Sequence, residues 1–169
     1  MTRPNHVWTM DIPYIPMARG FVYLTAVVDV ASRKVLAHKV AITLEACHAR
    51  EVIEQAFMRF GTPDIVNTDQ GSQFTAEEFT STVLAQGCKL SMDGRGAWRD
   101  NVFVERLWWS VKHEHVYRHD HQTVVSLYRG LDTYLEFFNR KRRHQSLADE
   151  TPWDVYHGKV MVKGPMARP

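Results

Sequence analysis

Residues 67–74 read Asn67-Thr68-Asp69-Gln70-Gly71-Ser72-Gln73-Phe74, and residues 100–107 read Asp100-Asn101-Val102-Phe103-Val104-Glu105-Arg106-Leu107. Between the acids Asp69 and Glu105 lie 35 residues (105 − 69 − 1). A third acid, Asp11, lies far upstream in the segment Trp8-Thr9-Met10-Asp11-Ile12. We expect the fold to bring these three carboxylates together.

The composition indicates a globular protein with one domain. The chain has 169 residues, 44% of them hydrophobic and 24% charged, which is ordinary for such a domain. No apolar run approaches the roughly 20 residues that span a bilayer, and residues 1–6 lack the pattern of a signal peptide. Cys47 and Cys88 are isolated and cannot build a disulfide framework. We therefore expect a cytosolic protein.

The net charge of +2 is unevenly distributed. Residues 139–169 contain seven Lys/Arg and three Asp/Glu, which gives +4, and residues 1–138 contain fourteen and sixteen, which gives −2. An acidic body with a basic end favours contact with a polyanion through that end. A solvated helix end is the equally plausible alternative.

The hydrophobic pattern predicts an α/β fold with a mixed five-stranded sheet flanked by helices. Alternation predicts a strand over residues 7–15, and a near-continuous apolar run over 21–30 suits a central strand. A third strand over 34–42 completes an antiparallel meander. Two short strands are expected at 65–68 and 88–92, the first ending just before Asp69.

Capping and periodicity predict the helices. The first starts at Thr43 and stops at Gly61-Thr62-Pro63, and the second starts with a capping box of Thr75 and Glu78. The glycine-containing segment 93–100 predicts a mobile loop, after which Asp100 caps the helix that carries Glu105. A last amphipathic helix runs into the basic residues at 140–143. We expect the catalytic-core domain to cover residues 1–157 and a disordered tail to cover 158–169.

Each acid has an ordinary explanation when it is taken alone. Asp11 lies in a strand of apolar residues, where an unpaired buried carboxylate is costly, but it can also lie on an exposed edge. Asp69 follows a strand and precedes Gly71, a position typical of ligand sites and also of turn residues. Glu105 lies on a helical edge with Asn101 and Lys112, next to an apolar stripe of Val104, Leu107, Trp108 and Val111.

Taken together, the three acids indicate a metal site. Two like charges about 4 Å apart repel by about 1 kcal/mol in water and roughly 4 kcal/mol at an effective dielectric constant of 20, so clustered carboxylates require a cation. Carboxylates with open positions for water and phosphate suit Mg²⁺ or Mn²⁺. Two such ions can promote in-line phosphoryl transfer.

The ordered set of motifs resembles the catalytic core of DDE transposases and retroviral-type integrases. The match is strongest to bacterial insertion-sequence transposases made from two overlapping frames. It covers residues 5–157 and rests on these motifs: Trp8-x-x-Asp11, Thr68-Asp69-Gln70-Gly71-Ser72-Gln73-Phe74, Asp100-Asn101-x-x-x-Glu105 with its 35-residue gap, Lys112, and Asn139-x-x-Arg142-x-His144-x-x-Leu147.

The resemblance implies a ribonuclease-H-like fold in which Asp11, Asp69 and Glu105 are the catalytic and metal-binding residues, with two Mg²⁺ or Mn²⁺ ions when DNA is bound. It implies hydrolysis at a transposon end and attack of the free 3′-hydroxyl on target DNA, without a covalent enzyme–DNA intermediate. Lys112 would approach the transposon end. A homo-oligomer on DNA, at the nucleoid of a bacterial cytoplasm, is expected. Relatives carry a helix-turn-helix region ahead of the core, so end recognition by this chain should need a separate region.

The remaining clusters are weaker signals. We expect Asn101, Lys112 and the run Arg140, Lys141, Arg142 and Arg143 to contact DNA, with protein acids as the alternative partners of that run. The histidines at 113, 115, 119 and 121 do not predict a zinc site, because their spacings should not face one point. Stacking of Trp98 on a flipped base remains an alternative to a core or lid role. We interpret Asp29 as structural, orienting Ser32 and Arg33.

The sequence therefore predicts a Mg²⁺-dependent DNA strand transferase. One alternative is a truncated, non-catalytic remnant that binds DNA or inhibits a full-length transposase. A second alternative is a ribonuclease-H-like nuclease for hybrids or junctions, which the motif at 139–147 disfavours.

Overall fold

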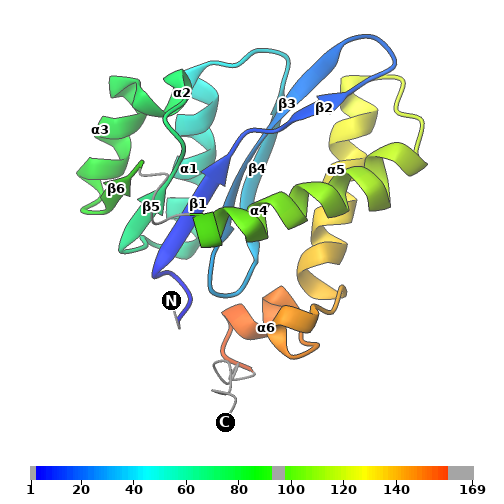
Figure 1. Cartoon of the computed structure of the whole chain (residues 1–169). Helices are drawn as coiled ribbons and strands as arrows, with labels where there is room; N and C mark the ends of the chain where they lie inside the picture. Colours follow the sequence, from blue (N-terminus) through cyan, green and yellow to red (C-terminus); the bar gives the residue numbers. More distant parts are fainter. Residues whose placement is uncertain (1–2, 93–97, 160–169) are drawn as a thin grey trace.

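A computed structural model describes residues 3–92 and 98–159, and for residues 98–101 it describes the backbone alone (Figure 1). The strands are β1 (Val7–Asp11), β2 (Tyr14–Pro16), β3 (Phe21–Asp29), β4 (Val35–Ala41), β5 (Ile65–Asn67) and β6 (Lys89–Ser91). The helices are α1 (Ala46–Phe60), α2 (Ser72–Thr75), α3 (Glu77–Ala85), α4 (Trp98–Ser110), α5 (Val124–Arg140) and α6 (Pro152–Tyr156). Short helical segments are η1 (Val111–His115, a π-helix), η2 (Val116–Arg118) and η3 (Gln145–Leu147).

One mixed sheet contains all the strands described. β3 pairs antiparallel with β1, β2 and β4, whereas β5 is parallel to both β1 and β6. β1 and β2 pair with the same edge of β3 in one continuous register. Trp8 pairs with Asp29 and Tyr14 with Tyr23, and in each pair the two residue numbers add up to 37. The predicted first strand is thus one strand interrupted near Pro13, and the predicted five-stranded mixed sheet is confirmed with six labelled segments.

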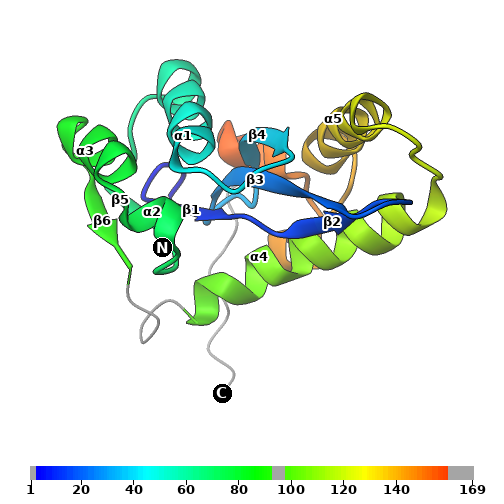
Figure 2. The same ribbon diagram turned by 90° about the horizontal axis from the view of Figure 1, so that it is seen from above.

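Two hydrophobic cores cover the two faces of the sheet. On one face, α1 and α3 pack on β1 and on residues of β3 and β4, around the fully buried Trp8 and Phe79. On the other face, α4 and α5 pack on β2 and on the alternate residues of β3, around Leu24, Leu127 and Leu131. Figure 2 shows α1 and α4 on opposite sides of the sheet.

The helix boundaries differ from several predicted caps. Helix α1 begins at Ala46 with Glu45 at the N-cap, because the Thr43 hydroxyl pairs with His48 Nε2 at 3.0 Å instead of capping the helix. The capping box at Thr75 is wrong, since Thr75 ends α2 and the N-cap of α3 is Ala76. Helix α4 begins at Trp98, so Asp100 lies inside the helix rather than at its N-cap. Residues 93–97 of the predicted loop and residues 160–169 of the predicted tail lie outside the described residues.

The motif at 139–147 holds the C-terminal segment against the domain. The Asn139 side chain pairs with the backbone of Val35 on the open edge of β4, accepting from its N–H and donating to its carbonyl oxygen, both at 2.9 Å. Arg142 makes a forked ion pair with Glu114, which also accepts a hydrogen bond from the Tyr134 hydroxyl at 2.6 Å. Leu147 is 1% exposed. This motif therefore has a structural explanation within the fold.

The structural role of Asp29 is confirmed. One carboxylate oxygen accepts from the backbone N–H and hydroxyl of Ser32, and the other accepts from the backbone N–H of Asn5. None of the helices in the described part of the chain is long and apolar enough to cross a membrane.

Candidate active site

Parallel pairing of β1 and β5 brings the first two acids together. Val7 pairs with Ile65 and Thr9 with Asn67, an offset of 58 residues. The same offset places Asp11 (11 + 58) level with Asp69, just beyond the last paired residue of β5. Asp11 ends a buried strand and is itself half-buried, whereas Asp69 is exposed. Two carboxylates thus lie at the carboxyl ends of adjacent parallel strands, as is typical of sites in α/β sheets.

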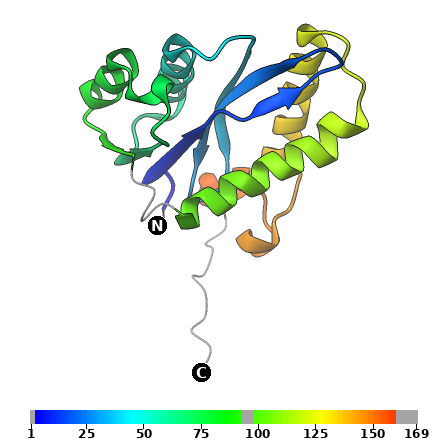
Figure 3. The ribbon, with the colours of Figure 1, turned by 45° about the horizontal axis from the view of Figure 1, so that its top comes forward.

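Helix α4 brings the third acid. The helix runs across the sheet beside β1 and β2 (Figure 3), and its residues Val104, Leu107 and Trp108 are buried against the sheet. The indole Nε1 of Trp108 donates to Asp11 Oδ2 at 2.8 Å, which ties the helix to the end of β1. Glu105 lies one turn before Trp108 and is exposed. The predicted apolar stripe of α4 is therefore confirmed, and Glu105 projects from its neighbouring edge.

The pKa of Asp11 reports the proximity of all three acids. Burial raises the pKa of this carboxyl above its usual value, while the hydrogen bonds from Trp108 and from the Ile12 backbone N–H oppose the rise. The negative charges of Asp69 and Glu105 raise this pKa further. Like-charge interactions of this kind are the arrangement that a bound cation relieves.

The loop after β5 fixes the Asp69 carboxylate. Its Oδ1 accepts a hydrogen bond from the backbone N–H of Gly71 at 2.8 Å. A Cβ atom added to Gly71 would lie 2.9 Å from Asp69 Oδ1 and would also meet the side chain of the buried Gln73. Gly71 therefore leaves the room that the Asp69 side chain occupies.

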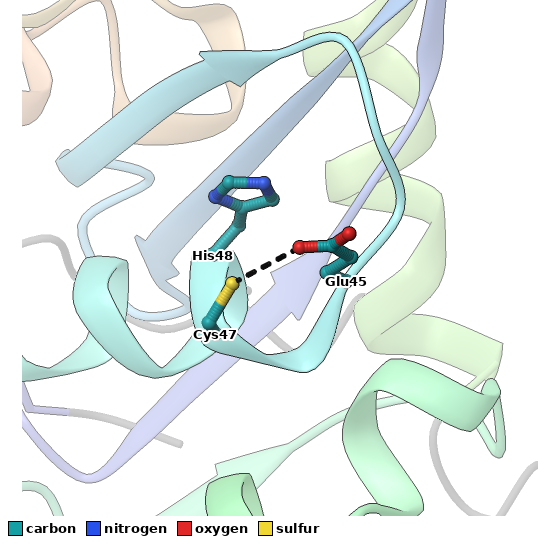
Figure 4. Close-up of side chains that lie close together, drawn as sticks. All are labelled: Glu45, Cys47 and His48. Carbon is teal, nitrogen blue, oxygen red and sulfur yellow. Dashed lines mark hydrogen bonds between the residues drawn. The ribbon is translucent and has the colours of Figure 1, made fainter.

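The three acids are close but not tightly clustered. Within the described residues, the one group of three His, Cys, Asp or Glu ligand atoms that all lie within 4.8 Å of one another consists of Glu45, Cys47 and His48. At least one pair among Asp11, Asp69 and Glu105 is therefore more widely spaced. The group at the start of α1 belongs to the opposite side of the sheet from α4, and within it the Cys47 thiol donates to Glu45 at 3.5 Å (Figure 4).

The residues expected to contact DNA have different environments. Lys112 Nζ lies 5.2 Å from the centre of the Tyr14 ring, on the η1 segment that continues α4. The Asn101 and Trp98 side chains lie outside the described residues. Lys141 and Arg143 are exposed, whereas Arg140 pairs with Glu136 and stacks on Trp153.

Arg142 requires a correction. The whole basic run was expected to meet phosphates rather than protein acids, but the guanidinium of Arg142 is half-buried and bonds both oxygens of Glu114. Glu114 lies 28 residues away in sequence, and nothing in the spacing of the basic run indicates this partner. We therefore remove Arg142 from the expected DNA contacts.

Three of the histidines stack on one another. His115 Nε2 and His121 Nε2 are 3.0 Å apart, and the ring centres of His115 and His119 are 4.5 Å apart. The π-helical turn of η1 and the return of the chain at η2 gather these rings beside Gly130 of α5. His113 lies apart, between Trp109 and Tyr117. Among the described residues, the ring nitrogens of these histidines do not form a group of three within 4.8 Å of one another.

One contact of the site was missed by the sequence reasoning. Trp108 was counted only as part of the apolar stripe, although an indole N–H that is buried usually finds a hydrogen-bond acceptor. Its position, one turn after Glu105 and facing the sheet, is the signal that could have suggested Asp11 as that acceptor.

Comparisons with known proteins show the family of this chain. Two family models described as "Integrase core domain" match residues 1–97 and 86–152. The chain is 32% identical over 156 residues to the transposase for insertion sequence element IS904 of Lactococcus lactis, covering 90% of this chain and 62% of that protein. It is 25% identical to the putative transposase InsK for insertion sequence element IS150 of Escherichia coli, covering 89% and 54%. The chain thus spans between about half and two thirds of these relatives.

Solved structures share the fold. The HTLV-2 integrase catalytic core domain in complex with magnesium matches with a TM-score of 0.74 and 22% identity, covering 92% of this chain and 98% of that one. The catalytic core domain of BIV integrase matches with a TM-score of 0.75 and 22% identity, covering 92% and 95%. These likenesses confirm the predicted ribonuclease-H-like α/β fold.

Proposed function

Because the chain belongs to the integrase core domain family, we propose that it is the catalytic core of a DDE transposase, with Asp11, Asp69 and Glu105 as the residues that hold its metal ions. The reaction would be cleavage at transposon ends followed by attack of the free 3′-hydroxyl on a phosphodiester of target DNA. The observation that carries this proposal is the meeting of the three acids, which come from two adjacent parallel strands and one helix tied to them by Trp108.

The acids suit two hard divalent ions. The charges of both Asp69 and Glu105 raise the pKa of Asp11, which supports a shared site. Each of its oxygens accepts one protein hydrogen bond, which leaves lone pairs for metal coordination. Ions in two-metal sites are about 3.5–4 Å apart, so acids that bind different ions need not lie within 4.8 Å of each other. Such ions, when bound, would activate the attacking oxygen and stabilise the leaving oxygen.

The protein groups have supporting roles in this proposal. Trp108 and the Ile12 backbone N–H orient Asp11, and the Gly71 backbone N–H orients Asp69. Lys112, Asn101, Arg140, Lys141 and Arg143 are proposed to contact the DNA backbone. Assembly of a homo-oligomer on transposon ends and target DNA, with a separate end-binding region, belongs to the same proposal and rests on the likeness to insertion-sequence transposases.

A nicking assay tests the acid assignment. We expect the purified chain to nick supercoiled plasmid in Mn²⁺ and Asp69→Asn to lower the rate at least 100-fold with an unchanged melting temperature. Asp64→Asn is the matched control, because Asp64 is exposed at the other end of β5 and pairs with Arg3. Retained nicking by purified Asp69→Asn would reject the assignment. DNA binding without nicking by the unmodified chain would favour the non-catalytic role.

A further inference from the structure

A cavity of about 480 Å³ lies beside α4, and none of the three acids is among its described lining residues. It is enclosed by α4, by the turn between β3 and β4, and by the segment from the end of α5 to η3. The residues that matter for its chemistry are Arg33, Arg106, Trp109, Arg142, Arg143 and His144. Its volume is within the roughly 300–1,000 Å³ typical of small-ligand sites.

The walls of the cavity are basic. Four arginines line it, and no Asp or Glu is among its described lining residues. Three of the arginines have protein partners: Arg142 pairs with Glu114, the Arg33 guanidinium stacks on the Phe103 ring at 3.2 Å, and Arg143 Nη1 donates to the Asp149 carbonyl oxygen at 3.3 Å. Arg106 and Arg143 are exposed. These two guanidinium groups can bind a phosphate in the bidentate manner that arginine favours.

His144 contributes a neutral ring to the same space. Burial and the neighbouring Arg142 lower the pKa of His144 to about 4, so the ring is neutral at pH 7. Its Nδ1 lies 3.4 Å from Arg142 Nη1. Its Nε2 is buried and has no hydrogen-bond partner in the described part of the chain. A buried polar atom without a partner favours a ligand that can pair with it.

Trp109 supplies an aromatic surface at the cavity. Its side chain is 58% exposed and stacks on His113 on one side, with ring centres 4.5 Å apart. Basic groups next to exposed aromatic rings are the combination with which proteins bind single-stranded nucleic acid. Trp109 lies one helical turn after Glu105, so a strand that reaches the acids passes this ring.

We propose that this cavity binds one unpaired nucleotide of the DNA substrate, with its phosphate between Arg106 and Arg143 and its base on Trp109, beside the neutral ring of His144. The inference rests on the proposed function and extends it, because it assigns the cavity to a single strand displaced beside the cleavage site. Stacking on Trp109 needs a base that is not already stacked within a duplex, so the proposed occupant is unpaired.

Fluorescence anisotropy in EDTA tests the proposal without metal-dependent chemistry. The probes are fluorescein-labelled dT12 and a 20-base-pair duplex, titrated with the full chain at several salt concentrations. We expect the double variant Arg106→Gln/Arg143→Gln to bind dT12 at least tenfold more weakly and to reduce the slope of log K against log salt by about 0.7, the contribution of one single-strand phosphate contact. Trp109→Ala should weaken dT12 binding about 5- to 150-fold, which corresponds to 1–3 kcal/mol of stacking. Duplex binding should fall by a clearly smaller factor than dT12 binding in each variant.

Two controls keep the result specific. Arg129→Gln removes one exposed arginine of α5 outside the cavity and should leave dT12 binding unchanged. Each variant must retain the melting temperature of the unmodified chain within about 3 °C, and Arg106→Lys/Arg143→Lys provides a charge-conserving pair for the same measurement. Unchanged dT12 affinity in the folded double variant, equal losses for dT12 and the duplex, or competition by an acidic peptide as strong as that by dT12 would overturn the proposal.

The proposed function is tested separately. Glu105→Gln should abolish nicking in Mn²⁺ and should keep dT12 binding in EDTA. If Glu105→Gln loses nicking while the cavity variants bind dT12 normally, the catalytic assignment stands and the nucleotide site is rejected. If Glu105→Gln nicks normally while the cavity variants lose dT12 binding, the nucleotide site stands and the catalytic assignment fails.

Discussion

Replacing Asn139 with alanine should destabilise the fold more than any exposed substitution, because one amide holds the open edge of the sheet. β4 pairs only with β3, and Asn139 satisfies both the N–H and the carbonyl oxygen of Val35 on its other side. Val35 is 5% exposed, so water cannot fully replace the lost partner. Each buried backbone group left unpaired costs about 1–3 kcal/mol, so the variant should lose roughly 2–5 kcal/mol of unfolding free energy.

Urea unfolding followed by circular dichroism measures this loss. For a chain of this length, 1 kcal/mol corresponds to about 2–4 °C in melting temperature, so a loss of 3 kcal/mol predicts a drop of roughly 6–12 °C. Hydrogen exchange should locate the effect, because the Val35 amide should lose protection beyond the global change. Gln55→Ala removes an exposed amide on α1 and should stay within about 0.5 kcal/mol of the unmodified chain.

An isosteric acid sharpens the test. Asn139→Asp keeps an acceptor for the Val35 N–H but places a carboxylate against the Val35 carbonyl oxygen at neutral pH. Protonation of that carboxylate restores a donor, so Asn139→Asp should regain stability relative to the unmodified chain as pH falls. A loss below about 1 kcal/mol in Asn139→Ala, or no relative gain of Asn139→Asp in acid, would refute the claim that these two hydrogen bonds hold the edge.

Three further predictions follow from named contacts. Gly71→Ala should lower metal-dependent nicking at least tenfold with a small change in melting temperature, because the new Cβ would lie 2.9 Å from Asp69 Oδ1; normal nicking would contradict this. Burial lowers the pKa of Lys34 to about 8, so between pH 8 and 9.5 the unfolded chain binds more protons than the folded chain. The free energy of unfolding of the unmodified chain should therefore rise by about 1.5 kcal/mol over this range. Urea unfolding should show no such rise for Lys34→Met. Hydrogen bonding from Arg142 lowers the pKa of Glu114, so the ion pair stabilises the fold above pH 4.5 and this contribution is lost as the pH falls through the pKa of the folded state. In an acid titration, the unmodified chain should lose unfolding free energy more steeply than Glu114→Gln. Parallel curves would argue against the ion pair.

The elements that sequence could predict are those with strong local patterns. The strand that ends at Asp11, the apolar run of β3 and the apolar stripe of α4 follow from periodicity, and their burial confirms them. The convergence of the acids was expected from the ordered motifs and the family resemblance that they carry. The register that makes Asp11 level with Asp69 needs the pairing of two strands 58 residues apart, which no local pattern encodes.

The failures share a physical cause. The contacts of Arg142 with Glu114 and of Asn139 with Val35 join residues 28 and 104 positions apart. The gathering of His115, His119 and His121 depends on a π-helical turn, which a regular helical period does not anticipate. The two threonines were wrongly predicted as caps. Thr43 pairs with His48, and Thr75 ends the short helix α2, so α3 begins after it with Ala76 at the N-cap.

Helix α4 carries Glu105 and also covers one face of the sheet, and this combination has a consequence for synthesis on the ribosome. A nascent chain that has emerged only as far as residue 92 already contains the whole sheet and two of the acids. It lacks the helix that supplies Glu105 and that covers the apolar face formed by Ile15, Val22 and Leu24. Burial of that face and completion of the set of three acids therefore both wait for α4. A prematurely released fragment should aggregate through its exposed apolar face and should lack the complete proposed metal site.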